Sequence, residues 1–493
     1  MHTLDNSSLI PQGWSWKICV LIAAVAVTVD VLLVQYPLVW LGAAGVLAVL
    51  AQFRSPISGL AVVIFSCGLA NYSPFETGAW SRLYPGNVAI GIFILAWLAS
   101  NISTSPKNFL PTTVVNKPLL GIGLMVPISM LWSRLHPDAE VTYAYPHSDV
   151  SWTTAQISQL VLLAATLCIP FAVAAAIKRW KDIETVVIVV GVTVAVGTLL
   201  TAGGLIFGFG GSYAILGATR AYWGQPWDSS IELTALCLPF LFSAVLFGRR
   251  SVSHYWLICG LFALCLLGLV LTFSRETWVL GFCGLLLVSA AWLRSRLSPA
   301  FRVMIVAFVT VVIVFSGIIG LVSTFYNPDE VYGLERMYYY ATALQLFTTH
   351  PVLGVGAGNY QFFDRSYEGD AAGGIAHNQF LTIAAETGIV GLLTFLWLVF
   401  TLFRVRSQLR FSVGSPGGSY EWLTVGGSAF LLLWIAECFF QEGFFATAAA
   451  GGGMHVMTLI VFPWILLGVL LGAYNLSQSA TSVETPGPED TSG

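Results

Sequence analysis

The sequence predicts an all-α, polytopic membrane protein, and its composition carries this prediction. Hydrophobic residues make up 57% of the 493 residues, whereas charged residues make up only 9%, against roughly 25% in an average soluble domain. The mean hydropathy is +0.81. A water-soluble fold of this length needs far more charge on its surface, so a soluble enzyme is excluded.

Net charge and cysteine usage exclude two further classes of protein. The formal net charge is −3 and the sequence has no basic patch, which excludes a nucleic-acid-binding protein. All 8 cysteines lie in apolar segments and none forms a Cys-x-x-Cys pair. We therefore expect small buried side chains rather than a disulfide framework.

Fourteen apolar segments are the predicted membrane spans, since a span needs about 20 predominantly apolar residues. They cover approximately residues 18–34, 37–53, 57–70, 87–100, 118–133, 154–176, 183–206, 229–247, 255–273, 277–293, 303–325, 379–403, 420–440 and 454–474. Residues 1–16 are polar, lack the features of a cleavable signal peptide, and are expected to be a cytoplasmic tail.

The spans divide the chain into two membrane parts separated by one long loop. Residues 17–325 hold the first eleven predicted spans, and residues 379–474 hold the last three. Residues 326–378 form the loop between them. Residues 475–493 are rich in Ser, Thr, Pro and Gly and are expected to form a disordered cytoplasmic tail.

The lysine and arginine distribution predicts the orientation of the spans. With a cytoplasmic N-terminus and alternating spans, 15 of the 21 basic residues fall in inner segments and six in outer ones, as the positive-inside rule requires. The split predicts an even number of spans and two cytoplasmic termini. The outer basic residues are all arginines: Arg82, Arg134, Arg220, Arg275, Arg336 and Arg365. This bias indicates either small-number chance or an outward anion site that uses the bidentate guanidinium fork.

The loop over residues 326–378 is expected to contain ordered structure. Apolar residues recur at helical spacing between Leu334 and Leu344, which predicts an amphipathic helix on the outer face of the membrane. His350-Pro351 ends this helix, and a glycine-rich turn over residues 354–358 follows. Because no strand precedes this turn, it does not indicate a dinucleotide site.

His377 stands at the outer mouth of the span over residues 379–403. A neutral imidazole at this boundary can act as a general base near pH 7. The alternative is an interfacial histidine that caps the start of the helix. Both interpretations follow from the same position in the sequence.

Arg275 lies in a very short outer turn, where a charge is costly unless it is paired. Glu276 is one possible structural partner, and a bound phosphate is the other. Arg336 opens the amphipathic helix and lies near the same opening, and Arg220 lies in an aromatic outer loop over residues 207–228.

Four carboxylic acids fall inside predicted spans: Asp30, Glu232, Glu386 and Glu437. Such residues form proton paths or hydrogen-bonded pairs between helices. Glu368-Gly369-Asp370 stands alone in a glycine-rich loop and is expected to be solvated rather than metal-bound. No His or Cys cluster has the spacing of metal ligands, so no metal or other cofactor is expected.

Several of these pieces, in this order, resemble the O-antigen ligase and polymerase family. The resemblance rests on Thr272-Phe273-Ser274-Arg275, Arg336-Met337-Tyr338, the stretch from His350 to Tyr360, His377-Asn378-Gln379 and Glu386-Thr387-Gly388. It covers residues 272–391. Gly391 stands where the ligase pattern has threonine, so ligase and polymerase both remain open.

The resemblance implies a GT-C-like membrane glycosyltransferase fold and a metal-independent, inverting enzyme. Such an enzyme moves a glycan from an undecaprenyl diphosphate carrier to a lipid A–core sugar or to another carrier-linked glycan, in lipopolysaccharide or other cell-surface polysaccharide biosynthesis. It lies in the lipid bilayer of the bacterial inner membrane and acts on the outer face.

The resemblance also implies roles for individual residues. His377 is then catalytic, and Arg275, Arg336 and the weaker candidate Arg220 bind the diphosphate. Asn378, Glu386 and Gly388 support the site. The predicted site therefore consists of seven residues: His377, Arg275, Arg336, Arg220, Asn378, Glu386 and Gly388.

Two other functions fit the sequence. A transporter for a small anion or for the lipid-linked glycan is consistent with the intramembrane acids, although the sequence has no evident inverted repeat of broken helices. A non-catalytic membrane scaffold is the third possibility, and the long, ordered outer loop argues against it. The clustering of arginine and histidine on one side favours the enzyme.

Overall fold

Helices account for nearly all of the described chain, as the apolar composition predicts. The computed structural model describes residues 37–70, 84–104, 113–139, 141, 152–207, 213–215, 218–220, 228–295, 298, 304, 331–363, 376–413, 419–445 and 453–483, with residues 250, 273, 442 and 443 excepted. The only described strands form a hairpin in which β1 (Tyr213–Ile215) pairs antiparallel with β2 (Ala218–Arg220).

The helices follow the predicted spans in chain order. The first eight are α2 (Pro37–Arg54), α3 (Pro56–Leu69), α4 (Pro85–Thr104), α5 (Asn116–Leu135), α7 (Trp152–Ala176), α8 (Trp180–Phe207), α9 (Asp228–Glu232) and α10 (Thr234–Phe247). The others are α11 (Tyr255–Leu271), α12 (Arg275–Trp292), α14 (Val331–Thr349), α15 (Gln379–Ser412), α16 (Glu421–Glu437) and α17 (Gly453–Val483), with short 3₁₀ turns at Leu293–Ser295 and Tyr360–Phe362.

Six helices of the described chain are long and apolar enough to cross a membrane. They lie at Pro85–Ile102, Asn116–Leu135, Trp152–Ala176, Trp180–Phe207, Gln379–Arg410 and Ile460–Gln478. Shorter apolar helices occupy most of the other predicted spans. The predicted spans 18–34 and 303–325 lie outside the described residues, so the total of fourteen stays a prediction.

One predicted span is divided rather than continuous. The segment 229–247 forms the short helix α9 and the longer helix α10, with a break at Leu233. At this break the Thr234 hydroxyl donates a hydrogen bond to the carbonyl of Ile231 (2.6 Å), which satisfies a polar group that the interrupted helix would leave exposed.

The last helix also differs from the prediction. It extends to Val483, whereas the sequence predicted that a disordered tail begins at residue 475. The reason is packing: Leu476 lies against the core, and Ser477 is buried and donates a hydrogen bond to the carbonyl of Tyr474 (2.7 Å). The remaining tail residues lie outside the described chain.

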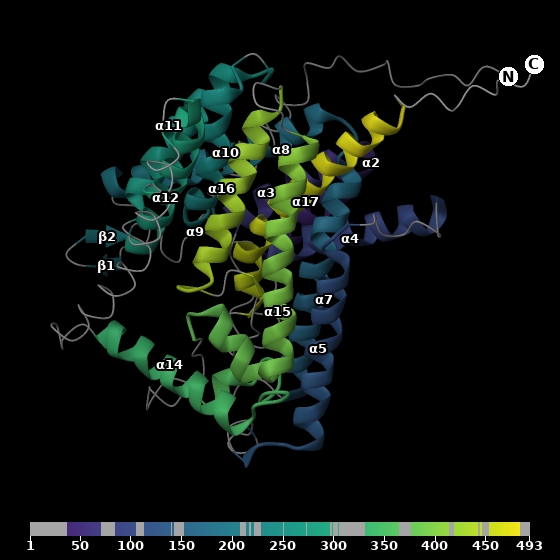
Figure 1. Cartoon of the computed structure of the whole chain (residues 1–493), viewed down its shortest axis with the longest axis vertical. Coiled ribbons are helices and arrows are strands. Elements are labelled where there is room, and N and C mark those ends of the chain that lie inside the picture. The colour runs from purple at the N-terminus through teal and green to yellow at the C-terminus, as the bar shows by residue number, and fades with distance from the viewer. Residues whose placement is uncertain are drawn as a thin grey trace, which may run out of the picture.

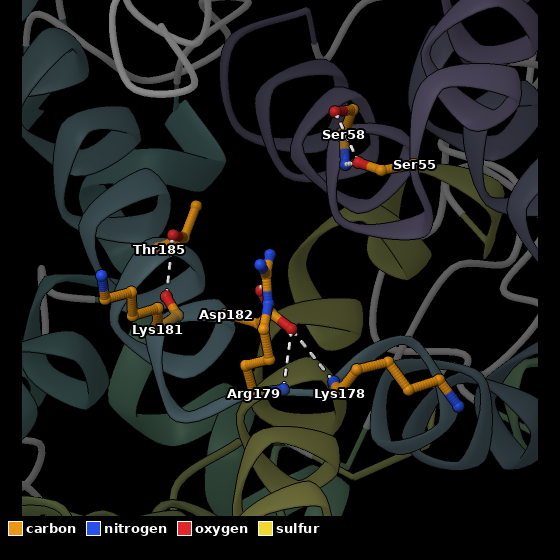
Figure 2. Close-up of polar contacts among 7 residues, drawn as sticks. All are labelled: Ser55, Ser58, Lys178, Arg179, Lys181, Asp182 and Thr185. Atoms are coloured by element: carbon orange, nitrogen blue, oxygen red, sulfur yellow. Dashed lines mark hydrogen bonds and ion pairs between the residues drawn. The ribbon is translucent and has the colours of Figure 1, made fainter. Parts of the chain in front are cut away.

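Basic residues precede helix α8 and mark one end of the bundle. Asp182 accepts hydrogen bonds from the backbone N–H groups of Lys178 (3.0 Å) and Arg179 (2.9 Å) and forms an ion pair with the Arg179 side chain (Figure 2). Figure 2 also shows the start of α3, where the Ser55 side chain accepts from the N–H of Ser58 (3.1 Å). We call the end of the bundle at which α8 begins the basic end.

Two further contacts bring other helices to the basic end. The Trp180 ring stacks on Tyr420, with 3.9 Å between ring centroids, so α8 and α16 begin together. The N–H of His254 donates to Glu184 (3.0 Å), so α11 begins there as well. The end of α16 lies away from the basic end and meets the start of α15, because the N–H of Gln379 donates to the carbonyl of Cys438 (2.9 Å).

The opposite end carries helix α14, which lies across the bundle rather than along it (Figure 1). The Nε2 atom of His350, directly after α14, lies 3.4 Å from a side-chain oxygen of Asp138, just beyond α5. The helix predicted in this loop is present and ends directly before His350-Pro351, while its place on the outer face stays a prediction.

Glycines allow close contact between α7 and α17 in the core. A Cβ atom added at Gly468 would lie 2.6 Å from Val173 Cβ and 2.8 Å from the carbonyl oxygen of Pro170. One turn later, Gly472 meets Ile177. Small residues at such positions let helix backbones approach closely, which is the main source of packing between helices in a membrane.

The substitution Gly468→Val is therefore expected to destabilise the protein by about 1–3 kcal/mol, because its side chain overpacks this contact. Thermal unfolding of detergent-solubilised protein measures the effect. Gly260→Ala is the control, because nothing lies within 4 Å of a Cβ at Gly260 in α11. Equal stability of the two variants would contradict the close α7–α17 packing.

Candidate functional site

Helix α15 is broken near its start, and the break builds the predicted site. Gly388 has φ 65° and ψ −163°, so the residues before and after it form two separate helical segments. A positive φ strongly favours glycine because it has no Cβ. A side chain here would also collide with the backbone of Val352.

The glycine-rich turn over residues 351–358 fills this break. The N–H groups of Ile389 and Val390 donate to the carbonyls of Pro351 (2.8 Å) and Val352 (3.5 Å). In return, the N–H groups of the turn at residues 355 and 356 donate to the carbonyls of residues 385 and 386, at 3.0 and 2.9 Å. The turn thereby satisfies backbone groups that a broken helix would otherwise leave without partners.

Positive φ angles at three glycines give the turn its shape. Gly354, Gly356 and Gly358 have φ angles of 68°, 97° and 80°. A Cβ at Gly354 would collide with the backbone of Glu386. The predicted tight turn is confirmed, and it packs against the broken helix α15.

Glu386 and Ser129 fasten the turn to the bundle. The Glu386 carboxylate accepts a hydrogen bond from the N–H of Tyr360 (3.2 Å), and the residue is 5% exposed. The Ser129 hydroxyl of α5 donates to the Glu386 carbonyl (2.7 Å) and accepts from the N–H of Ala357 (3.2 Å). Glu386 therefore orders the backbone of the turn, and its predicted support of the site stays a prediction.

His377, Asn378 and Gln379 have different structural roles at the start of α15. Asn378 is the helix cap, because its side chain accepts from the N–H groups at positions 380 (3.0 Å) and 381 (3.1 Å). Gln379 is buried, and its side chain accepts from the N–H groups of Phe444 and Phe445 at 3.0 and 3.1 Å. The alternative in which His377 caps the helix is therefore wrong.

His377 adopts a backbone conformation that few non-glycine residues adopt. Its φ is 48°, the only positive φ among the described residues other than glycine. Such a conformation costs about 1–3 kcal/mol and occurs preferentially at functional sites. The His377 ring is half-buried and faces Tyr339 of α14, with 5.9 Å between ring centroids.

Tyr339 is itself held in place by the glycine-rich segment. The Tyr360 hydroxyl donates to the carbonyl of Tyr339 (2.7 Å), while the Tyr360 N–H binds Glu386. A continuous set of contacts thus links the break in α15 to the ring that faces His377. Tyr339, Tyr360 and Ser129 were not predicted as site residues, because nothing in their local sequence indicates these distant partners.

The structure describes the backbone of the three predicted arginines but not their side chains. Arg336 lies in α14, one helical turn before Tyr339, and thus on the helix that contacts His377. Arg275 is the first residue of α12, after Ser274, whose hydroxyl accepts from the N–H of Thr277 (3.4 Å). Arg220 ends the hairpin strand β2, and no contact given for β2 connects it to His377.

The start of α12 reaches the His377 region through the residues after α16. The Gln441 side chain donates to the Glu276 carboxylate (3.2 Å), and the N–H of Gln379 donates to the carbonyl of Cys438 (2.9 Å). His377, Arg275 and Arg336 therefore stand on elements that meet at one end of the bundle. Glu368 and Asp370 lie outside the described residues. Among the described residues, no group of potential metal ligands occurs.

The arrangement combines an imidazole on a strained backbone, two helices that carry arginine and a set of polar groups at one end of the bundle. A half-buried imidazole can accept a proton from a hydroxyl group. Arginine forks suit a diphosphate, and the N-terminus of α12 has the polarity that favours an anion.

Comparison with known proteins agrees with this chemistry. Residues 260–396 match the family model described as O-antigen ligase. The matched segment contains α11, α12, α14, the glycine-rich turn and the first part of α15, and hence Arg275, Arg336 and His377. No curated protein matches the chain.

Proposed function

We propose that this protein is a glycan transferase of the bacterial inner membrane, because residues 260–396 match the family model described as O-antigen ligase. Its donor is a glycan on undecaprenyl diphosphate, and its acceptor is a sugar hydroxyl on a glycolipid or on another carrier-linked glycan. The observation that carries the proposal is the strained backbone of His377, whose ring faces Tyr339 of the arginine-bearing helix α14.

In the proposed reaction, the acceptor oxygen attacks the anomeric carbon of the donor sugar. The bond from this carbon to the carrier phosphate breaks, and the carrier diphosphate leaves with the bonding electrons. His377 takes the proton of the acceptor hydroxyl. Attack opposite the leaving group inverts the anomeric configuration, as expected for an inverting glycosyltransferase with a GT-C-like fold.

Arg275 and Arg336 are proposed to hold the carrier diphosphate. Charge-assisted, bidentate hydrogen bonds to phosphate strengthen as negative charge develops on the leaving group. The helix positions of both residues support this role. Arg220 is the weaker third candidate, because its position on β2 has no described link to His377.

The orientation follows from the two ends of the bundle. The basic end, with Lys178 and Arg179, is proposed to face the cytoplasm, and α14 is proposed to lie on the outer face. Both termini are then cytoplasmic. Reporter fusions at residue 365 and at the C-terminus test this prediction, with one reporter that is active only outside the cytoplasm and one that is active only inside it. At residue 365 only the outside reporter is expected to be active, and at the C-terminus only the inside reporter. The reverse pattern would contradict the orientation.

Transfer is expected to proceed without a divalent metal, because arginine can neutralise the diphosphate in place of a cation. Turnover by purified protein in EDTA is the measurement, with untreated protein as the control. Activity that EDTA abolishes and Mg²⁺ or Mn²⁺ restores would contradict the prediction. It would also direct attention to Glu368 and Asp370.

A transporter remains the second candidate, and the break at Gly388 favours it, since transporters bind substrates at broken helices. In this chain, however, the turn over residues 351–358 occupies the break and bonds its backbone groups. Because these backbone groups are already hydrogen-bonded, the break is better suited to hold His377 rigidly than to bind a transported substrate.

The glycolipid profile of a deletion strain tests the proposed function and separates its two forms. Loss of a ligase leaves full-length polymer on the carrier. Loss of a polymerase leaves acceptors that carry a single repeat. An unchanged profile would contradict both forms.

A further inference from the structure

We propose that Glu437, Glu276 and Gln441 form a subsite that binds hydroxyl groups of the acceptor sugar beside His377. This inference rests on the proposed function and identifies the substrate that this part of the site receives. The three residues come from the end of α16, the first turn of α12 and the segment after α16.

Side chains from the ends of two helices meet at this point. Glu437 ends α16, and its backbone carbonyl accepts a hydrogen bond from the N–H of Gln441 (2.9 Å). The Gln441 side chain is exposed and donates to Glu276 in the first turn of α12 (3.2 Å). The group thus contains two carboxyls and an amide, with one member open to solvent.

The second observation concerns Glu437 alone. Its oxygen Oε2 is buried and accepts no hydrogen bond from the residues that the structure describes. A buried carboxyl oxygen without a donor costs free energy. An incoming hydroxyl group supplies the missing donor.

Backbone contacts place this group next to the proposed base. Cys438, directly after Glu437, accepts a hydrogen bond from the N–H of Gln379 (2.9 Å). Phe439 accepts from the side chain of Asn378 (3.3 Å). The end of α16 is therefore fastened to the two residues that follow His377, so an acceptor held at Glu437 lies beside the imidazole.

The chemistry of the group selects the acceptor over the donor diphosphate. Carboxyl oxygens accept hydrogen bonds, and sugar hydroxyls donate them. A diphosphate at the same point would meet like charges, which repel it. Within the described residues no set of side chains suits a metal ion. Sugar hydroxyls remain as the ligand that supplies donors without adding negative charge.

The test uses purified full-length protein, an undecaprenyl-diphosphate-linked glycan as donor and a lipid A–core glycolipid as acceptor. Glu437→Gln is expected to raise the KM for the acceptor about tenfold, because the amide offers the sugar hydroxyl one acceptor oxygen where the carboxyl group has two. Donor binding is expected to stay unchanged. Gln441→Ala is a second, exposed variant and is expected to raise the same KM by a smaller factor.

Glu421→Gln is the matched control, because Glu421 starts the same helix at the basic end of the bundle. It is expected to keep the wild-type KM. A purely structural role for Glu437 predicts that Glu437→Gln alters thermal stability at most and leaves the acceptor KM unchanged. That result, or a loss of donor binding instead, would overturn the subsite.

Acceptor binding without donor separates this inference from the proposed function. If wild-type protein binds the glycolipid and Glu437→Gln weakens that binding, the subsite is supported even where no transfer occurs. Wild-type protein that transfers nothing overturns the proposed function. Transfer that is normal in both variants overturns the subsite alone.

Discussion

Purified protein with His377→Ala is expected to transfer glycan about 10²–10⁴-fold more slowly than wild type, the usual effect of removing a general base. Donor binding is expected to persist, because His377 takes the acceptor proton and does not hold the diphosphate. Single-turnover transfer from a labelled carrier-linked glycan measures the rate, and a separate assay measures donor binding.

Arg275→Lys provides the complementary variant for the same assays. It keeps the charge and loses the bidentate fork, so it is expected to weaken donor binding as well as transfer. Near wild-type turnover by His377→Ala would show that His377 is not the base. Unchanged donor binding by Arg275→Lys would assign Arg275 a structural charge at the start of α12.

Gly388→Ala is expected to prevent assembly of the site. The positive φ alone costs about 1–3 kcal/mol for a residue with a side chain. The added Cβ also collides with the backbone of Val352, which cannot move without breaking its hydrogen bonds to α15. We expect low yield of folded protein and no detectable transfer, measured by size-exclusion chromatography and single-turnover kinetics.

Gly354→Ala is expected to have the same effect, because its Cβ collides with the backbone of Glu386 from the other side of the contact. Gly260→Ala in α11 is again the control, since it meets open space. Normal folding and transfer by both Gly388→Ala and Gly354→Ala would contradict the packed turn within α15.

The sequence predicts the structure most accurately where apolar runs and helix-ending residues are local signals. The span predicted at residues 379–403 begins at Gln379, as α15 does, and the predicted amphipathic helix corresponds to α14. The glycine-rich turn was predicted from its residues, and its positive φ angles confirm it. These features depend on neighbours within a few residues.

The break in α15 depends on contacts that sequence position does not reveal. Gly388 lies in a continuous apolar run, and isolated glycines are tolerated in helices of membrane proteins. Its conformation follows from Val352 and Pro351, which lie some way back in the chain. The same limit applies to Ser129, whose partner Glu386 belongs to a different part of the sequence.

The candidate site shows the same division. His377 was predicted from its place at a span boundary, but its φ and its contact with Tyr339 come from the tertiary structure. Asn378 was predicted only as a supporting residue, and it is the helix cap. Glu437 was noted as an intramembrane acid, and only the packing of α12 against α16 brings Glu276 near it.

Reconstitution in proteoliposomes tests the central claim most directly. Wild-type protein is supplied with a labelled undecaprenyl-diphosphate-linked glycan and a lipid A–core acceptor in the same bilayer, and both the glycolipid product and the released carrier diphosphate are measured. The proposed function predicts equal amounts of the two products from wild type and almost none from His377→Ala. Intact donor that moves across the bilayer without forming product, equally in wild type and His377→Ala, would contradict it and identify a transporter.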